Sequence, residues 1–367
     1  MPERESETQS QACTQTGEPT IIRPIAMDLH PIETGNYRVA TPAIEAFHDL
    51  ILRCLRYRIP GALIYGPSRT GKTRAIEYLH LLLAETQPKI TTYHAQAEHK
   101  PRHAEGPFFA NLLEAVGYPE PDKGSNATKR MRLVNKMKEA CSRNGAGTVL
   151  LFCDEAQRYD ESEYEWLRDV HDHLDRLQIR LYTFLVGQQE LLAVKTAFQK
   201  ARKTQIVARL MVEELPYFGI RNAQDVATCL HGYDSTNFPR DTDWSFTRYY
   251  LPKAFDNGYR LVDDATVLWR SFEHLHHSCA LPSGLEIPME SFTRAVEIVL
   301  KDGESRDNAT YRPSEEVWRT AVKRCGYVQS RQATSQTMMA IPRAAWPRRT
   351  GCARYGHHHV VADCYLR

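Results

Sequence analysis

Short apolar runs alternate with helix-like segments between residues 41 and 216 of this 367-residue chain. The runs that favour β-strands cover residues 62–65, 89–95, 147–153 and 179–186, with a short fifth strand inside 206–215. The segments that favour helices cover residues 74–84, 107–116, 126–143, 162–177 and 190–203. Strands that alternate with helices form parallel sheets with right-handed crossovers. The pattern therefore predicts a three-layer α/β sandwich.

The pattern changes after Pro216, where strand-like runs disappear. Only helical periodicity remains, over residues 221–231, 245–257, 261–279, 288–302 and 313–325. At the other boundary, Thr41-Pro42 is typical of an N-cap followed by proline at the first helical position, which predicts a helix to about Arg56. The sequence thus predicts an α/β domain over 41–216 and a small helical lid domain over 217–325.

One stretch, GPSRTGKT, matches the GxxxxGK[ST] phosphate-binding loop. It follows a strand-like run and opens into a helix-like run, which is the context that the motif requires. Glycines let successive N–H groups face an anion, and the helix N-terminus adds a favourable dipole. Lys72 can reach the β/γ-phosphates of ATP, and the Thr73 hydroxyl can ligate Mg²⁺. The expected nucleotide-binding residues are Gly66, Pro67, Ser68, Arg69, Thr70, Gly71, Lys72 and Thr73.

A second motif, TVLLFCDE, places two carboxylates after a continuous apolar run at residues 148–155. Such a run indicates a buried parallel strand, and ligands of open α/β sheets bind at the carboxyl ends of the strands. We expect Asp154 to hold Mg²⁺, directly or through water, together with Thr73. We expect Glu155 to act as the general base that orients and polarises the attacking water.

The combination of sandwich, phosphate loop, acidic pair and helical lid predicts the AAA+ arrangement of P-loop NTPases. In such ATPases a polar residue beside the acidic-pair strand senses the γ-phosphate. Gln188 stands at that position, just after the 179–187 run, and Gln189 is its rival. A neighbouring subunit supplies an arginine that stabilises transferring charge. Arg209 is the first candidate for that role and Arg202 is the second.

The distribution of charge along the chain limits where ordered structure and DNA contacts can lie. The formal charge is +2, but residues 1–40 carry three basic and six acidic groups, while residues 326–367 carry six arginines and one aspartate. The first segment is polar with Pro interruptions and the second lacks periodicity, so we expect a poorly ordered extension and a basic flexible tail. The region between them is neutral, so any DNA contact must come from local patches.

The chain has no sign of a membrane or export segment. No apolar run approaches the roughly 18 residues that span a bilayer, and the N-terminus lacks an apolar signal core. The nine cysteines are scattered and form no CxxC pair. We therefore expect a reduced, cytoplasmic location without membrane partners.

The strings GPSRTGKT, LLFCDEAQR, FLVGQQEL and IVARLMVEELP together resemble the TniB/TnsC group of transposition ATPases, which are relatives of MuB. The resemblance covers roughly residues 40–235, and secretion ATPases of the ExeA type share the DEAQ and VGQ-like strings. The resemblance implies an ATP-dependent regulator that forms rings or filaments on double-stranded DNA. Such a regulator links a target-selection protein to the transposase, and ATP hydrolysis resets the assembly. The alternative is a remodelling or ExeA-like secretion ATPase that acts on protein.

Basic side chains in the loop after the second strand, and others before or at the start of the helix over 126–143, are the candidates for phosphate contacts in the central channel of an oligomer. The candidate DNA-binding residues are Lys100, Arg102, Lys123, Lys129 and Arg130. A solvated charged surface is the competing interpretation of each.

The tail also carries Cys352, Cys364 and the run His357–His359, but without CxxC or HxxxH spacing a flexible tail fits better than a zinc site. Its arginine-rich stretch, 343–354, can instead grip nucleic acid or a partner protein.

Overall fold

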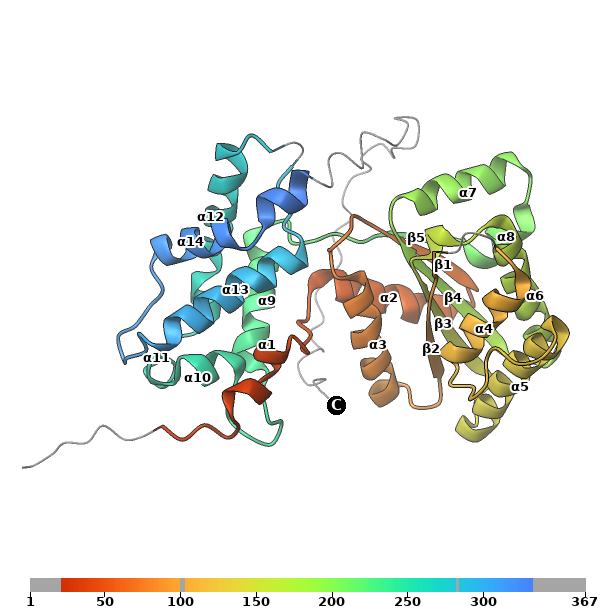
Figure 1. Cartoon of the computed structure of the whole chain (residues 1–367), viewed down its shortest axis with the longest axis horizontal. Helices are drawn as coiled ribbons and strands as arrows, with labels where there is room; N and C mark the ends of the chain where they lie inside the picture. The colour runs from red at the N-terminus through yellow and green to blue at the C-terminus, as the bar shows by residue number, and fades with distance from the viewer. Residues whose placement is uncertain (1–20, 100–102, 282–283, 333–367) are drawn as a thin grey trace, which may run out of the picture.

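The computed structural model describes residues 21–99, 103–281 and 284–332, which form an α/β lobe and a helical lobe (Figure 1). The α/β lobe contains a parallel five-stranded sheet in the order β2-β3-β4-β1-β5. The strands are β1 (Gly61–Tyr65), β2 (Thr91–Gln96), β3 (Thr148–Asp154), β4 (Arg180–Gly187) and β5 (Glu213–Pro216). The three central strands are almost wholly buried, as their unbroken apolar runs predict.

Helices cover both faces of the sheet. One face packs against α2 (Pro42–Tyr57) and α3 (Lys72–Thr86), and Figure 1 shows these two helices on the side of the sheet nearer the lid. The other face packs against α4 (Glu105–Ala115), α5 (Asn126–Asn144), α6 (Glu161–Arg176), α7 (Glu190–Lys200) and α8 (Thr204–Leu210). Residues alternate along β1, with Ala62 and Ile64 facing the first set and Leu63 facing the second. The predicted three-layer sandwich is confirmed.

The helical lobe has its own apolar core. Its helices are α9 (Ala223–Ser235), α10 (Phe246–Tyr250), α11 (Pro252–Asp256), α12 (Ala265–Ser278), α13 (Met289–Glu304) and α14 (Glu315–Arg324). Short 3-10 helices occur at η1 (Met27–Leu29), η2 (Ala156–Arg158) and η3 (Leu261–Asp264). The helical region after the sheet has the position and composition of an AAA+ lid, as predicted.

Two local expectations differ from the structure. The helix expected over 245–257 is divided at Pro252, which has no N–H to donate and holds Leu251 outside the helical region. The strand expected inside 206–215 begins only at Glu213, because the residues before it form α8.

The expectation of poor order over residues 1–40 does not hold for residues 21–40, which we call the N-terminal strap. The strap includes α1 (Pro31–Thr34), and its Ile32 and Tyr37 are buried in the lid core. The Tyr37 hydroxyl donates to a carboxylate oxygen of Glu297 at 2.5 Å, and Lys301 pairs with Glu33 at 2.8 Å. A few apolar side chains that pack into the lid core are enough to order a polar segment, which composition alone does not reveal.

The expectation of a flexible tail likewise does not hold for residues 326–332, which the structure describes. Tyr327 is fully buried in the lid core, and its hydroxyl lies 2.8 Å from Nδ1 of the buried His276. Residues 333–367, and with them the histidine run and the arginine-rich stretch, lie outside the described residues.

Candidate active site

The phosphate-binding loop connects β1 to α3 at the carboxyl edge of the sheet. Because β1, β3 and β4 are neighbours in a parallel sheet, this edge also receives the acidic pair and the end of β4. The Gly66 N–H donates to the Gly187 carbonyl oxygen at 3.2 Å, so the loop begins in contact with β4. The sequence-predicted loop, acidic pair and Gln188 are therefore brought to one edge.

Two glycines of the loop are required by geometry. A Cβ atom on Gly66 would lie 1.9 Å from the carbonyl oxygen of Tyr217, whose own N–H donates to Tyr65 O at 2.7 Å. Gly71 has φ = +95°, a backbone conformation that suits glycine, and it stands as the N-cap of α3. The loop is thus shaped by the backbone beside it as well as by its own sequence.

Lys72 is 7% exposed and its ammonium group turns into the loop. Its Nζ donates to the carbonyl oxygens of Gly66 at 2.9 Å and Pro67 at 2.6 Å. Burial lowers the pKa of Lys72 to about 8, against the opposing attraction of Glu155 and Asp154. The cation is therefore desolvated and faces the position where the motif places phosphate oxygens.

Thr73 and Asp154 place two oxygen donors side by side, and oxygen donors are the ligands that hard cations prefer. The Thr73 hydroxyl donates to Asp154 Oδ2 at 2.6 Å, and Asp154 is almost fully buried. Burial acts to raise the pKa of Asp154, but the His94 imidazole, 3.8 Å away, and the Thr73 hydroxyl outweigh it and hold the pKa below its usual value. An ionised carboxylate beside a hydroxyl is an oxygen donor set that fits Mg²⁺.

Glu155 has an unusual backbone and a restrained side chain. Its φ of +53° and ψ of +32° lie in the left-handed region, which is uncommon for a residue with a side chain and is concentrated at functional sites. Its N–H donates to Asp154 Oδ1 at 2.9 Å, and its Oε2 accepts from Gln157 Nε2 at 2.7 Å. Arg158 approaches the same oxygen to 3.7 Å. The side chain remains 22% exposed, so the carboxylate is accessible to water.

The two glutamines after β4 lie in the same region. Both are half-buried; Gln188 follows the last strand residue directly, and Gln189 stands at the N-cap position of α7. The Gln188 N–H donates to Gln157 Oε1 at 3.2 Å. The choice between Gln188 and Gln189 as γ-phosphate sensor therefore stays open.

Arg209 lies at the opposite edge of the sheet from the phosphate loop. It is on the last turn of α8, and one of its guanidinium nitrogens lies 2.7 Å from Asp172 Oδ1. It lines a cavity of about 200 Å³ with Arg58 and Arg180, at the amino ends of β1 and β4. Arg209 is therefore remote from the phosphate loop of its own chain, and its role toward a neighbouring subunit stays a prediction. Arg202 is exposed beyond the end of α7.

The DNA-contact candidates need correction. Lys129 is only 7% exposed, and its Nζ donates to the Gly106 carbonyl oxygen at 3.3 Å, so it joins α5 to α4 and does not line a channel. Arg130 is paired with Glu105 and lies over the Phe109 ring, 5.4 Å from its centroid. Lys123 is exposed and pairs with Glu120 at 2.6 Å. Lys100 and Arg102 lie outside the described residues.

The structure adds contacts that sequence reasoning did not assign. Gln157 contacts both Glu155 and the end of β4, and the DEAQ string that contains it was the available signal. The lid also reaches the phosphate loop, because Arg69 pairs with Glu290 of α13 at 3.4 Å. Such a contact between distant segments has no local signal in the sequence.

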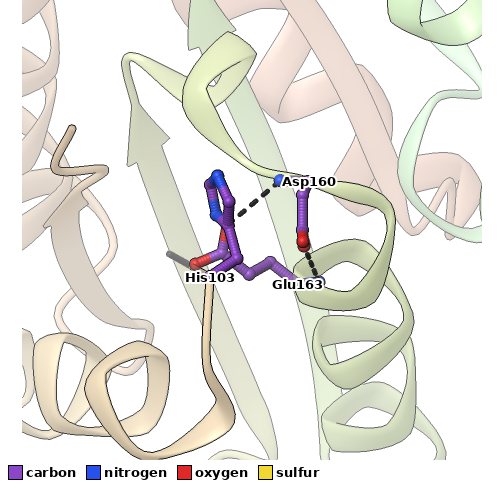
Figure 2. A group of neighbouring side chains, drawn as sticks. All are labelled: His103, Asp160 and Glu163. Carbon is purple, nitrogen blue, oxygen red and sulfur yellow. Dashed lines mark hydrogen bonds and ion pairs between the residues drawn. The ribbon is translucent and has the colours of Figure 1, made fainter. Parts of the chain in front are cut away.

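A second group of potential metal ligands lies away from this edge. Figure 2 shows His103, before α4, beside Asp160 and Glu163 at the start of α6. The Glu163 N–H donates to Asp160 Oδ1 at 2.9 Å, while Glu163 Oε2 lies 3.0 Å from the Asp160 N–H and 2.7 Å from His103 Nδ1. The carboxylates therefore form a capping box that starts α6, with the histidine as an added partner. Capping explains the group without a metal ion.

Residues 60–194 match the AAA domain family, a segment that contains the phosphate loop, the acidic pair and the end of β4. A comparison with curated proteins finds no match. Within the described residues, no helix is long and apolar enough to cross a membrane.

Solved structures of low sequence identity align with most of this chain. The ORC2 protein of Aeropyrum pernix, in ADPNP and ADP complexes, aligns with a TM-score of 0.51 and 14% identity, over 85% of this chain and 75% of that chain. The ORC1 protein of the same organism, in complex with DNA, aligns with a TM-score of 0.48 and 16% identity, over 83% and 70%. Cdc6p from Pyrobaculum aerophilum gives 0.45 and 11%, over 83% and 71%. The AAA+ P-loop fold is confirmed, and the narrower resemblance to transposition ATPases stays a prediction.

Proposed function

We propose that this protein binds and hydrolyses ATP at the loop between β1 and α3. The observation that carries the proposal is the contact of Thr73 with Asp154, because the phosphate loop and the acidic pair come from segments 81 residues apart and meet at 2.6 Å. Lys72 adds a desolvated cation, and Glu155 adds a partly exposed carboxylate at the same edge. Four groups with complementary roles then lie where a triphosphate would bind.

Each group has a defined part in the reaction. Lys72 and the loop N–H groups bind the β/γ-phosphates, and Thr73 and Asp154 would hold Mg²⁺, which would supply positive charge beside the phosphates. Glu155 accepts a proton from the attacking water and orients it in line with the γ-phosphate. Gln188 or Gln189 contacts the γ-phosphate, and Arg209 of a neighbouring copy stabilises charge in the transition state.

We further propose that the ATPase regulates DNA transposition. The support is the run of strings that resembles the TniB/TnsC group, which extends beyond the phosphate loop through both glutamines and Arg209. In this function the protein assembles with copies of itself on double-stranded DNA and links a target-selection protein to a transposase. Hydrolysis then resets the assembly.

The burial of Lys129 and the pairing of Arg130 favour keeping a second candidate, a remodelling ATPase that acts on protein. Fewer basic side chains remain for phosphate contacts than the sequence suggested. Electron microscopy of negatively stained protein with ATP, with and without duplex DNA, separates the two candidates. Rings or filaments that require DNA support the transposition function, and assembly indifferent to DNA supports the alternative.

Two substitutions test the ATPase itself. Lys72→Ala should abolish tight ATP binding, because the desolvated cation at the phosphates is lost. Glu155→Gln should bind ATP with nearly unchanged affinity and turn it over about 10²- to 10⁴-fold more slowly, which is the usual contribution of a general base. Full turnover by Glu155→Gln in a phosphate-release assay would remove Glu155 from the reaction.

A further inference from the structure

Gln157 connects two parts of the candidate site that the sequence places 31 residues apart. Its side-chain Nε2 donates to Glu155 Oε2 at 2.7 Å, and its Oε1 accepts from the Gln188 N–H at 3.2 Å. The orientation of the amide is fixed by chemistry. A backbone N–H can only donate and an ionised carboxylate can only accept, so Oε1 must face Gln188 and Nε2 must face Glu155.

The backbone at the end of β4 leaves space for this amide. A Cβ atom on Gly187 would lie 2.1 Å from Gln157 Oε1, so only glycine leaves room for the side chain at the end of β4. The Gly187 carbonyl oxygen in turn accepts from the N–H of Gly66, the first residue of the phosphate loop. A continuous path of contacts therefore runs from the phosphate loop through the end of β4 and Gln157 to Glu155.

Glu155 needs such a partner because its own backbone is strained. The left-handed φ of +53° is a strained conformation for a residue that carries a Cβ atom. Arg158, at 3.7 Å, is too distant for a hydrogen bond, so Gln157 makes the direct hydrogen bond to this carboxylate within the described residues.

We propose that Gln157 is a positioning residue that holds the Glu155 carboxylate and makes its orientation depend on the end of β4. The inference rests on the proposed function of Glu155 as general base. Contact of a γ-phosphate with Gln188 would displace the N–H that Gln157 accepts from, and the displacement would reach Glu155 through one rigid amide. The same residue that senses nucleotide would then adjust the base that acts on it.

The test uses the full-length protein, with Gln157→Ala, Gln157→Glu and the exposed control Gln199→Ala. ATP affinity is measured with N-methylanthraniloyl-ATP, and kcat by phosphate release between about pH 5.5 and 9. Gln157→Ala should lower kcat about tenfold, a fraction of what a general base contributes, with ATP affinity within about threefold of wild type. Gln199→Ala should match wild type in both.

The pH profile of Gln157→Glu separates positioning from a merely structural role. At high pH two carboxylates face each other and repel, so kcat should fall at least as far as in Gln157→Ala. As the pH falls, the pair takes up one shared proton, and the introduced carboxyl group, once protonated, can donate to Glu155 as the amide did. Activity relative to wild type should therefore recover toward the acid end of the range. The charged groups that face Glu155 are the same in both proteins; they are Lys72, Asp154 and Arg158.

Gly187→Ala provides an independent route to the same contact, because its methyl group displaces Gln157. The double variant Gly187→Ala/Gln157→Ala should turn over ATP no more slowly than the slower of the two single variants, because both changes remove the same interaction. Three results would each overturn the inference while the proposed function stands. The kcat losses of Gly187→Ala and Gln157→Ala could be additive in the double variant, the kcat of Gln157→Ala could equal that of Gln199→Ala, or the ratio of Gln157→Glu kcat to wild-type kcat could be independent of pH. Absence of turnover in wild type, or full turnover in Glu155→Gln, would overturn the proposed function instead.

Discussion

Replacing Lys72 with methionine should stabilise the protein that has no nucleotide bound, although it removes ATP binding. The reason is the lowered pKa, which moves from 10.5 to about 8 on burial. A difference of about 2.5 units corresponds to about 3 kcal/mol against the charged form in the folded state. Methionine has a similar volume and no charge to desolvate, but it loses the bonds to two carbonyl oxygens, about 1 kcal/mol each. The expected net gain in the free energy of unfolding is therefore about 1 kcal/mol near neutral pH.

The gain must depend on pH with a defined sign. Below pH 8 the lysine is charged in both the folded and unfolded states, so wild type bears the full penalty. Between pH 8 and 10.5 the folded state releases its proton first, so the penalty shrinks, and above 10.5 it vanishes. The advantage of Lys72→Met should therefore be largest below pH 8 and decline across this window.

Thermal unfolding of wild type, Lys72→Met and the exposed control Lys200→Met at about pH 7 and pH 9.5 measures this advantage. Each kcal/mol corresponds to about 2–4 °C for a lobe of this size. The buried variant should unfold at a higher temperature than wild type at neutral pH, with a smaller difference at the alkaline pH, and the control should show neither effect. A destabilised Lys72→Met protein, or an advantage that does not change with pH, would refute the assignment of a desolvated cation.

Arg209 and the basic DNA-contact candidates allow two further tests. Mixing Arg209→Ala with Lys72→Ala subunits should restore some ATPase activity, because a mixed interface can contain one intact site; co-assembled mixtures that stay inactive would give Arg209 a structural role. DNA affinity, measured by fluorescence anisotropy on duplex DNA, should fall about tenfold or more between about 50 and 200 mM salt, and neutralising Lys100, Arg102 and Lys123 should flatten that dependence. An unchanged salt dependence would move the DNA contact to another surface.

The parts of the fold that the sequence predicts are those governed by local rules. The Thr41-Pro42 start of α2 is confirmed, because the Thr41 hydroxyl accepts from the Ile44 N–H at 3.2 Å. The phosphate loop and acidic pair are likewise local motifs, and the parallel topology then brings them together. Local reasoning also accounts for two of the differences: Pro252 marks the break in the lid helix, and Lys129 lies one turn before the buried Leu133 on α5.

The remaining features depend on contacts between distant segments. Nothing near Gln157 in the sequence indicates that Gly187 leaves room for its amide, since that requires the positions of β3 and β4 in the sheet. The order of the N-terminal strap is hidden for a similar reason. Its Tyr37 is buried only because Tyr233 and Glu297, which lie 196 and 260 residues later, provide the partners for its hydroxyl.

The N-terminal strap also changes how the lid can move. Within the described residues, the chain crosses between the lobes twice, once from the strap into α2 and once from β5 through Tyr217 to α9. Gly219 is held closely against the backbone of Ile287 at the second crossing, with the Ile220 N–H donating to the Ile287 carbonyl oxygen at 2.9 Å. The two crossings together define an axis between the lobes. We therefore expect any movement of the lid to be a rotation about the line through both crossings, because a twist across that line would pull Ile32 and Tyr37 out of the lid core.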